Sequence, residues 1–213
     1  MHSYASDGKD GYTALGIIAV ASLGCAYALG CALDHFKVAV PWWLDAPSIL
    51  GFYALLFGIY NSAAWRWKIL GFQLSGVPEI RGTWYGEIVS DYAGETRREG
   101  MIFIAQTWSK IAICFENEVS RSYSRMASLN VTPGVNEGLI YEYANDPANG
   151  SATTMHGHRG LAFLRLAQDG ETLSGEYFTG RDRNTSGRVA LRKLSTTRMD
   201  FEAAKTCYHK EQQ

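Results

Sequence analysis

Two segments in the second half of the chain carry side chains that suit a nucleotide. Alternation along a strand over 137–145 places Tyr141 and Tyr143 on one face. The same alternation in a later strand brings Tyr177 and Thr179 together. Tyrosine rings stack on bases while their hydroxyls form hydrogen bonds, which favours a base-binding surface. Tyrosines at this spacing are also common as barrel lining, so the two explanations stand side by side.

A turn rich in arginine and glycine follows the second of these strands. It places Arg181 and Arg183 among small residues, between Gly180 and Gly187. Guanidinium groups offer planar paired donors and glycine lets backbone amides approach, so this turn is a candidate phosphate site. The alternative is a solvated hairpin tip whose arginines pair with Asp182.

Other polar residues give weaker signals. Gln106 is an inward polar candidate, and His158 is a candidate for the rim of a barrel. His156 alternates with His158, but a third ligand of the right type is missing nearby, so we expect no metal site. A Ser-His-Asp set, a P-loop and a dinucleotide fingerprint are also missing, so we expect a protein that is not an enzyme and has no cofactor.

The elements that position these residues are strands. Apolar residues recur with period two, often between turn signals, in eight segments: 82–92, 101–108, 110–116, 119–129, 137–145, 157–167, 172–180 and 186–194. Short connections without helical crossovers imply antiparallel order, and closure protects the sheet edges. We therefore predict an all-β, up-and-down barrel of about eight strands, with Trp84 plugging one end. Such a barrel is filled by side chains or holds one small ligand.

Two apolar stretches precede the barrel. Residues 13–32 form an uncharged run of about 20, enough to cross a bilayer as a helix, and residues 48–64 form a shorter one. We predict a membrane helical hairpin over 1–77, the barrel domain over 78–195 and a polar tail over 196–213.

Charge sets the predicted orientation. Arg66, Lys68 and Arg81 follow the second stretch, whereas the loop between the stretches offers Lys37 against two aspartates. The positive-inside rule therefore places both termini and the barrel in the cytoplasm. The net charge is −1, so the chain lacks the field needed to bind a DNA or RNA duplex.

Several motifs together resemble the CD-NTase-associated protein 15 family, effectors of bacterial cyclic-oligonucleotide anti-phage signalling systems (CBASS). The resemblance rests on residues 139–147, 158–160, 173–181 and 186–189, together with the two apolar stretches. It implies that a partner CD-NTase makes a cyclic dinucleotide, which the barrel binds. It further implies that the protein then forms a homo-oligomer, disrupts the inner membrane and causes growth arrest or death of the infected cell.

Two other functions fit the same elements. A membrane-tethered, lipocalin-like barrel would carry an apolar small molecule. A barrel with a filled core would instead act as a scaffold that recruits a protein. For the effector, the spacings Gly24 to Ala28 and Ala26 to Gly30 in the first stretch suit close helix packing, although small residues are frequent in any membrane helix.

Overall fold

The computed structural model describes eight ranges of the chain: 1–8, 10–38, 45–69, 72–91, 95–132, 137–147, 158–180 and 184–212. These residues form two compact units. One comprises Met1–Asp7 and Pro78–Gln213, and the other comprises Gly8–Val77.

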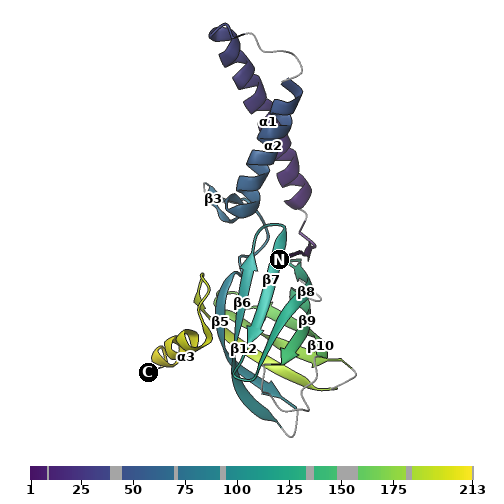
Figure 1. Ribbon diagram of the computed structural model, residues 1–213, viewed down its shortest axis with the longest axis vertical. Helices are drawn as coiled ribbons and strands as arrows, with labels where there is room; N and C mark the ends of the chain where they lie inside the picture. Colours follow the sequence, from purple (N-terminus) through teal and green to yellow (C-terminus); the bar gives the residue numbers. More distant parts are fainter. Residues whose placement is uncertain are drawn as a thin grey trace. The chain divides into compact units, whose positions relative to one another are not determined.

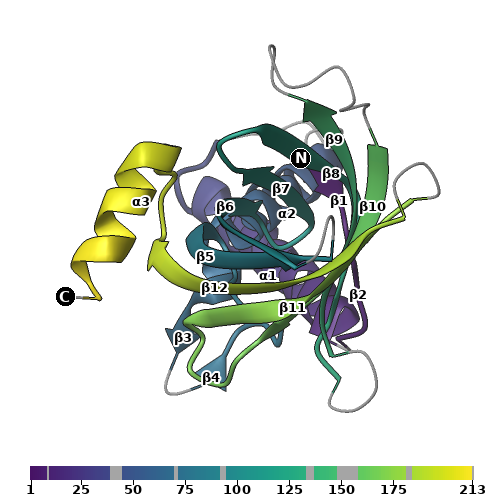
Figure 2. The ribbon, with the colours of Figure 1, turned by 90° about the horizontal axis from the view of Figure 1, so that it is seen from below.

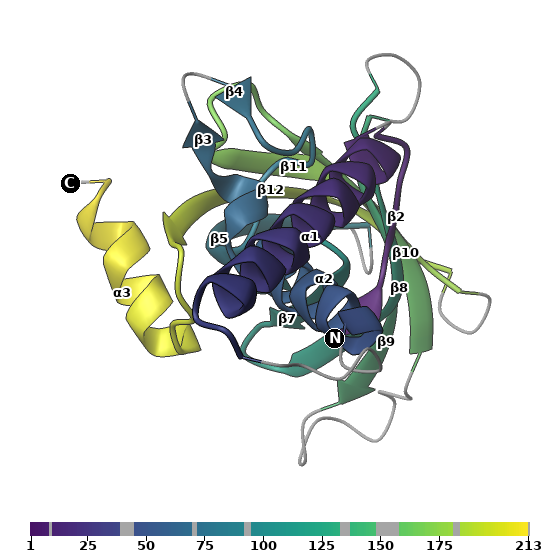
Figure 3. The same ribbon diagram turned by 90° about the horizontal axis from the view of Figure 1, so that it is seen from above.

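The Gly8–Val77 unit is an antiparallel pair of helices followed by a small hairpin. It contains α1 (Asp10–His35), α2 (Asp45–Ser62), the 3₁₀ turn η2 (Ala64–Arg66), and the strands β3 (Lys68–Ile69) and β4 (Phe72–Gln73). Figure 1 and Figure 3 show α1 and α2 crossing each other. A stripe at four-residue spacing in α1, namely Ala14, Ile18 and Ser22, is buried. The stripe follows from helical geometry, which returns every fourth residue to one face.

Large apolar side chains on other parts of the α1 surface are exposed. Ile17, Val20 and Leu23 are each more than half exposed. Within the described residues, one helix is long and apolar enough to cross a membrane, Gly11–His35, with a mean hydropathy of 2.0 in its most apolar window. The apolar part of α2, Ser48–Ser62, falls short of that length. The first predicted span is thus supported by length and composition, and the second stays a prediction.

The other unit is a barrel. Its eight main strands are β5 (Gly82–Ser90), β6 (Thr96–Gln106), β7 (Lys110–Glu116), β8 (Ser120–Asn130), β9 (Gly138–Pro147), β10 (His158–Leu166), β11 (Thr172–Thr179) and β12 (Ser186–Ser195). Each strand pairs antiparallel with its neighbours in sequence, and β12 pairs with β5 to close the ring. Figure 2 shows this ring of strands viewed end-on. The predicted eight-stranded up-and-down barrel is confirmed.

The first residues of the chain belong to the barrel as well. Direct pairing of β7 with β8 is confined to three residue pairs, from Cys114 with Tyr123 to Glu116 with Arg121. Beyond them, β1 (His2–Ser3) pairs antiparallel with β7 and β2 (Ala5–Ser6) pairs parallel with β8. Figure 1 shows this terminus beside both strands. The N-terminal segment, which the sequence analysis placed in the membrane region, therefore fills a seam in the barrel wall.

The two ends of the barrel differ. We call the end where β5 begins and β6 finishes the closed end, and the end where β5 finishes and β6 begins the mouth. At the closed end the interior is packed with apolar side chains exposed by at most 1%: Trp84, Ile104, Ile111, Leu139, Leu164, Leu173 and Leu191. The Trp84 indole donates to the Ile80 carbonyl at 2.9 Å, and the Lys193 ammonium lies 5.3 Å from its ring. The prediction that Trp84 plugs one end is confirmed.

A short helix follows the last strand. Asp200 caps α3 (Phe201–Lys210) by accepting from the Ala203 amide at 2.8 Å. Outward-facing Tyr85 and Met101 are buried because they pack with Ala204 of this helix. The segment predicted as a polar tail, 196–213, therefore contains a short helix.

Candidate functional site

Two tyrosines occupy the mouth because glycines on the neighbouring strands leave room for them. Tyr143 pairs with Gly160, and a Cβ on Gly160 would overlap the tyrosine ring. Tyr177 pairs with Gly187 of β12, and a Cβ there would overlap its ring in the same way. The close approach explains why glycine stands at both positions. Two aromatic rings thus enter the barrel interior from β9 and β11.

The candidates on β9 and β10 form one aromatic cluster. The rings of Tyr141 and Tyr143 have centroids 6.2 Å apart, and those of Tyr143 and His158 are 6.4 Å apart, edge to face. The His158 Nδ1 lies 3.5 Å from the amide nitrogen of Asn145, its partner across the strands. Burial raises the pKa of Tyr141, so this residue stays neutral at physiological pH. The cluster therefore offers hydrogen bonds and ring faces without a fixed charge.

Thr179 has a different role from the one its spacing suggests. Its hydroxyl oxygen accepts from the Thr185 amide at 2.8 Å and lies 3.1 Å from the Thr185 carbonyl oxygen. It therefore ties together the two sides of the turn at the mouth. Arg181 and Arg183, the phosphate candidates in that turn, lie outside the described residues.

Gln106 lies at the closed end, away from the other candidates. Its side-chain oxygen accepts from the Ile80 amide at 2.9 Å, and its NH₂ group donates to the Pro78 carbonyl at 3.1 Å. Gln106 was rightly taken as an inward polar group, but its amide binds the chain segment that enters β5. We do not include it in the site.

Sequence reasoning passed over two polar residues of the mouth. Register places Ser122 of β8 opposite Asn145 of β9, and Asn145 opposite His158. Ser122 is buried, at 4% exposure, and Asn145 shares its strand face with Tyr143. The alternation that selected Tyr141 and Tyr143 also includes Asn145, so the sequence pattern could have identified this residue. Ser122 became visible once the strands were paired.

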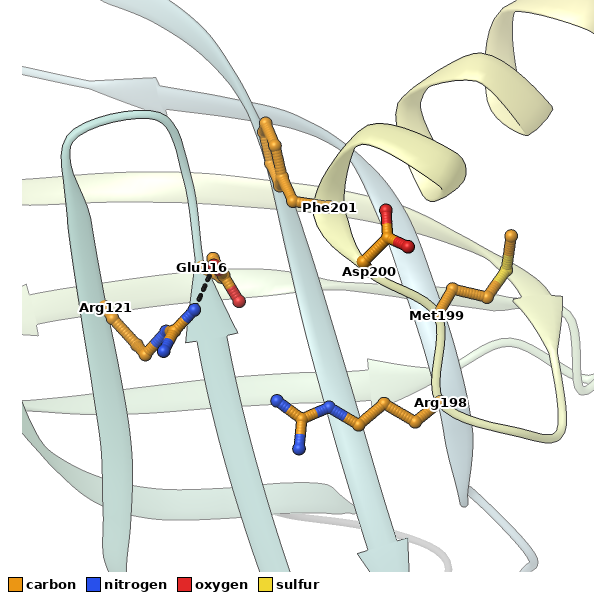
Figure 4. Close-up of a pocket in the computed structure, with 6 residues that line it drawn as sticks. All are labelled: Glu116, Arg121, Arg198, Met199, Asp200 and Phe201. Carbon is orange, nitrogen blue, oxygen red and sulfur yellow. Dashed lines mark hydrogen bonds and ion pairs between the residues drawn. The ribbon is translucent and has the colours of Figure 1, made fainter.

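A shallow pocket outside the barrel is a poorer candidate. Figure 4 shows its lining: Glu116, Arg121, Arg198, Met199, Asp200 and Phe201. Arg121 is ion-paired with Glu116, and the Arg198 guanidinium lies 5.5 Å from the Phe103 ring. Asp200 is committed to capping α3. The charges of this pocket are therefore already used within the fold.

The described residues contain no group of three His, Cys, Asp or Glu side chains that could hold a metal ion. His156, the partner considered for His158, lies outside the described ranges. The cluster on β8, β9, β10 and β11 offers aromatic rings, hydroxyls and an amide, which are groups that bind an organic ligand.

Fold and mouth together define a class of protein: a closed eight-stranded barrel, joined to a helical region, with aromatic and polar side chains gathered at one end. A family described as "Cap15, cyclic dinucleotide receptor domain" matches residues 75–193, which include β5 to β11 and most of β12. The chain is also 31% identical over 144 residues to CD-NTase-associated protein 15 from Yersinia aleksiciae, covering 68% of each chain. The chain therefore belongs to the CD-NTase-associated protein 15 family and carries its receptor domain.

Proposed function

We propose that the mouth of the barrel binds a cyclic dinucleotide and that the protein is a CBASS effector rather than an enzyme. The observation that carries this proposal is the pair of rings, Tyr143 and Tyr177, seated on glycines at the mouth of a barrel that matches the receptor family. A cyclic dinucleotide presents two bases and two phosphates. Ring faces suit the bases, and hydroxyl or amide groups suit their polar edges.

The filled closed end argues against a carrier of apolar molecules. Such a carrier needs a deep apolar cavity, whereas Trp84, Leu139 and Leu164 pack the interior at that end. The polar atoms gather instead at the mouth, on Ser122, Asn145 and His158. The residues proposed to contact the ligand are therefore Tyr141, Tyr143, His158 and Tyr177, with Arg181 and Arg183 on the adjoining turn. Thr179 bonds to Thr185, on the other side of the segment that contains both arginines.

The helices are proposed to carry out the response to the ligand. We place the protein in the bacterial inner membrane as a hairpin of two spans, α1 and α2, with both termini in the cytoplasm. Ligand from a partner CD-NTase would promote homo-oligomerisation through the helices, disrupt the membrane and stop the growth of the infected cell. The exposed Gly24 and Ala28 support contact between helices of neighbouring copies, because a Cβ on Gly24 would meet nothing within 4 Å.

The chain connects the barrel and the helical unit at two positions. Asp7 and Pro78 mark the two positions where the chain passes between the units, and both bond to the closed end of the barrel. In this proposal, ligand bound at the mouth affects these two connections through the strands of the barrel. It can do so only by binding the assembled state more tightly than the resting state.

The direct test is calorimetry on the full chain in detergent with a panel of cyclic dinucleotides carrying purine and pyrimidine bases. A fragment that begins at residue 78 would lack β1 and β2, so the full chain is needed. We expect Tyr177→Leu to weaken binding by about 1–3 kcal/mol, the usual loss on removing a stacking ring. Tyr123→Leu is the matched control, because Tyr123 lies on β8 outside the mouth and is 46% exposed. Absence of binding across the whole panel would contradict the proposal.

Membrane disruption has its own test. The full chain is reconstituted in liposomes that contain a self-quenched dye, and the ligand found by calorimetry is added. We expect dye release with wild-type protein and none with Tyr177→Leu at the same concentration of ligand. Intact liposomes in the presence of bound ligand would refute membrane disruption but not the proposed binding of a cyclic dinucleotide.

A further inference from the structure

One arginine of β6 has an unusual position among the charged residues near the mouth. Arg98 pairs with Ile88 across the β5–β6 ladder, and directly paired residues point to the same side of a sheet. Ile88 is buried at 8% exposure and lies on the interior face with Gly86 and Trp84. Arg98 therefore stands on the strand face that continues the barrel interior, at the mouth.

Other arginines near this end form ion pairs on the outer face of the barrel. Arg97 pairs with Glu87 at 3.3 Å, Arg188 with Glu95 at 3.5 Å, and Arg121 with Glu116. For Arg98 the described part of the chain provides neither an ion pair nor a hydrogen bond, and its side chain is exposed. An arginine that is not engaged within the fold remains available to an anion.

The surroundings place this charge close to the rim. Lys205 mainly, and Arg98 to a smaller extent, hold the pKa of the Glu118 carboxyl below its usual range. Glu118 lies between β7 and β8 at the mouth, and its carboxylate bonds to Lys205 at 2.9 Å. Arg98 thus interacts electrostatically with Glu118, whose charge is already balanced by Lys205.

Resting on the proposed function, we infer that Arg98 binds a phosphate of the cyclic dinucleotide from the β6 side of the mouth. The bases would stack on the tyrosines of β9 and β11, across the barrel from β6. Arginine suits this task because its planar guanidinium gives two parallel hydrogen bonds to phosphate oxygens. The β6 side of the mouth thus supplies a permanent positive charge beside the described cluster of tyrosines, Asn145 and His158.

The test compares Arg98→Ala with Arg97→Ala, the neighbouring residue that faces outward. Calorimetry on the full chain uses the best ligand of the cyclic dinucleotide panel at two or more salt concentrations. We expect Arg98→Ala to raise Kd about 10- to 100-fold and to flatten the dependence of Kd on salt, because one screened charge contact is lost. Arg97→Ala should keep the wild-type Kd and salt dependence. Arg98→Lys should recover the salt dependence with part of the affinity.

The outcomes separate the two proposals. If wild type and Arg98→Ala bind with equal Kd and equal salt dependence, the role of Arg98 is overturned and the receptor function stands. If wild type binds no member of the panel, both are overturned. Arg98→Gln, which is shorter but keeps an uncharged polar side chain, replaces Arg98→Ala if the latter unfolds at the assay temperature.

Discussion

The imidazole Nε2 of His2 lies 2.8 Å from the Ser124 hydroxyl oxygen, which also accepts from the Ile113 amide at 2.9 Å. Ser124 therefore links the first strand of the chain with both β7 and β8. It stands at a register shift in β8, where its partner across the ladder is Tyr143 of the mouth. The N-terminal segment is thus fixed next to the wall that carries a proposed ligand contact.

Removal of residues 2–6 should open the seam between β7 and β8. In the intact chain, backbone groups near Ile111 and Leu129 pair with this segment, and the deletion exposes them. We expect a loss of stability on the order of 2–4 kcal/mol, since each lost hydrogen bond costs about 0.5–1.5 kcal/mol net. Thermal unfolding in detergent gives the loss, and hydrogen exchange locates it. His2→Ala should have a smaller effect, and unchanged exchange in β7 and β8 would contradict the seam.

Gln106→Leu should destabilise the barrel without changing ligand affinity. The substitution leaves the buried Ile80 amide without its acceptor, which costs about 1–3 kcal/mol. Denaturant unfolding measures the loss, and calorimetry measures the affinity. Gln106→Glu keeps an acceptor for the Ile80 amide but sets a carboxylate against the Pro78 carbonyl, so it should not restore the stability. A large drop in affinity with Gln106→Leu in still-folded protein would return this residue to the site.

Gly160→Ala should disturb the mouth through Tyr143. The new methyl group would overlap both the Tyr143 ring and the Phe178 carbonyl, so we expect lower stability and weaker ligand binding. The double variant with Tyr143→Ala tests the cause, because removal of the ring relieves part of the overlap. The double variant should be more stable than the sum of the single effects predicts. Simple additivity would show that the ring and the glycine are not coupled.

Asp7 should make the seam sensitive to acid. Its carboxylate accepts from the Val131 amide at 2.6 Å and the Thr132 amide at 3.2 Å. Hydrogen bonds from these two residues hold the pKa of Asp7 below its ordinary value of 3.8. A lowered folded-state pKa means that the stabilisation is complete above the ordinary value and is lost as pH falls through the folded value.

The corresponding measurement is the melting temperature of wild type and Asp7→Ala from pH 7 down to about pH 3. We expect wild type to be more stable near neutral pH and the difference to shrink in acid. Asp7→Asn keeps an acceptor that does not titrate, so its advantage over Asp7→Ala should not depend on pH. A constant gap between wild type and Asp7→Ala would refute the role of the charge.

Local pattern in the sequence was sufficient for the barrel. Period-two alternation gave eight strands, and short connections gave their order, because side-chain direction in a strand depends only on position. The same alternation placed Tyr141 with Tyr143, and Tyr177 with Thr179, on one strand face. Hydropathy identified α1 because the length of an apolar helix is a local property as well.

Tertiary structure decided what depends on partners distant in sequence. β6 begins at Thr96, five residues before the predicted start, because Thr96 and Arg97 pair with β5 although both strand faces are polar there. The N-terminal segment is too short to show a period, and it forms strands only because β7 and β8 leave a gap. Gln106 and Arg98 are both polar residues of β6, although Arg98 lies outside the strand predicted from the sequence, 101–108. Register sends the first to the closed end and the second to the mouth, because pairing fixes the level of a residue in a barrel and sequence alone does not.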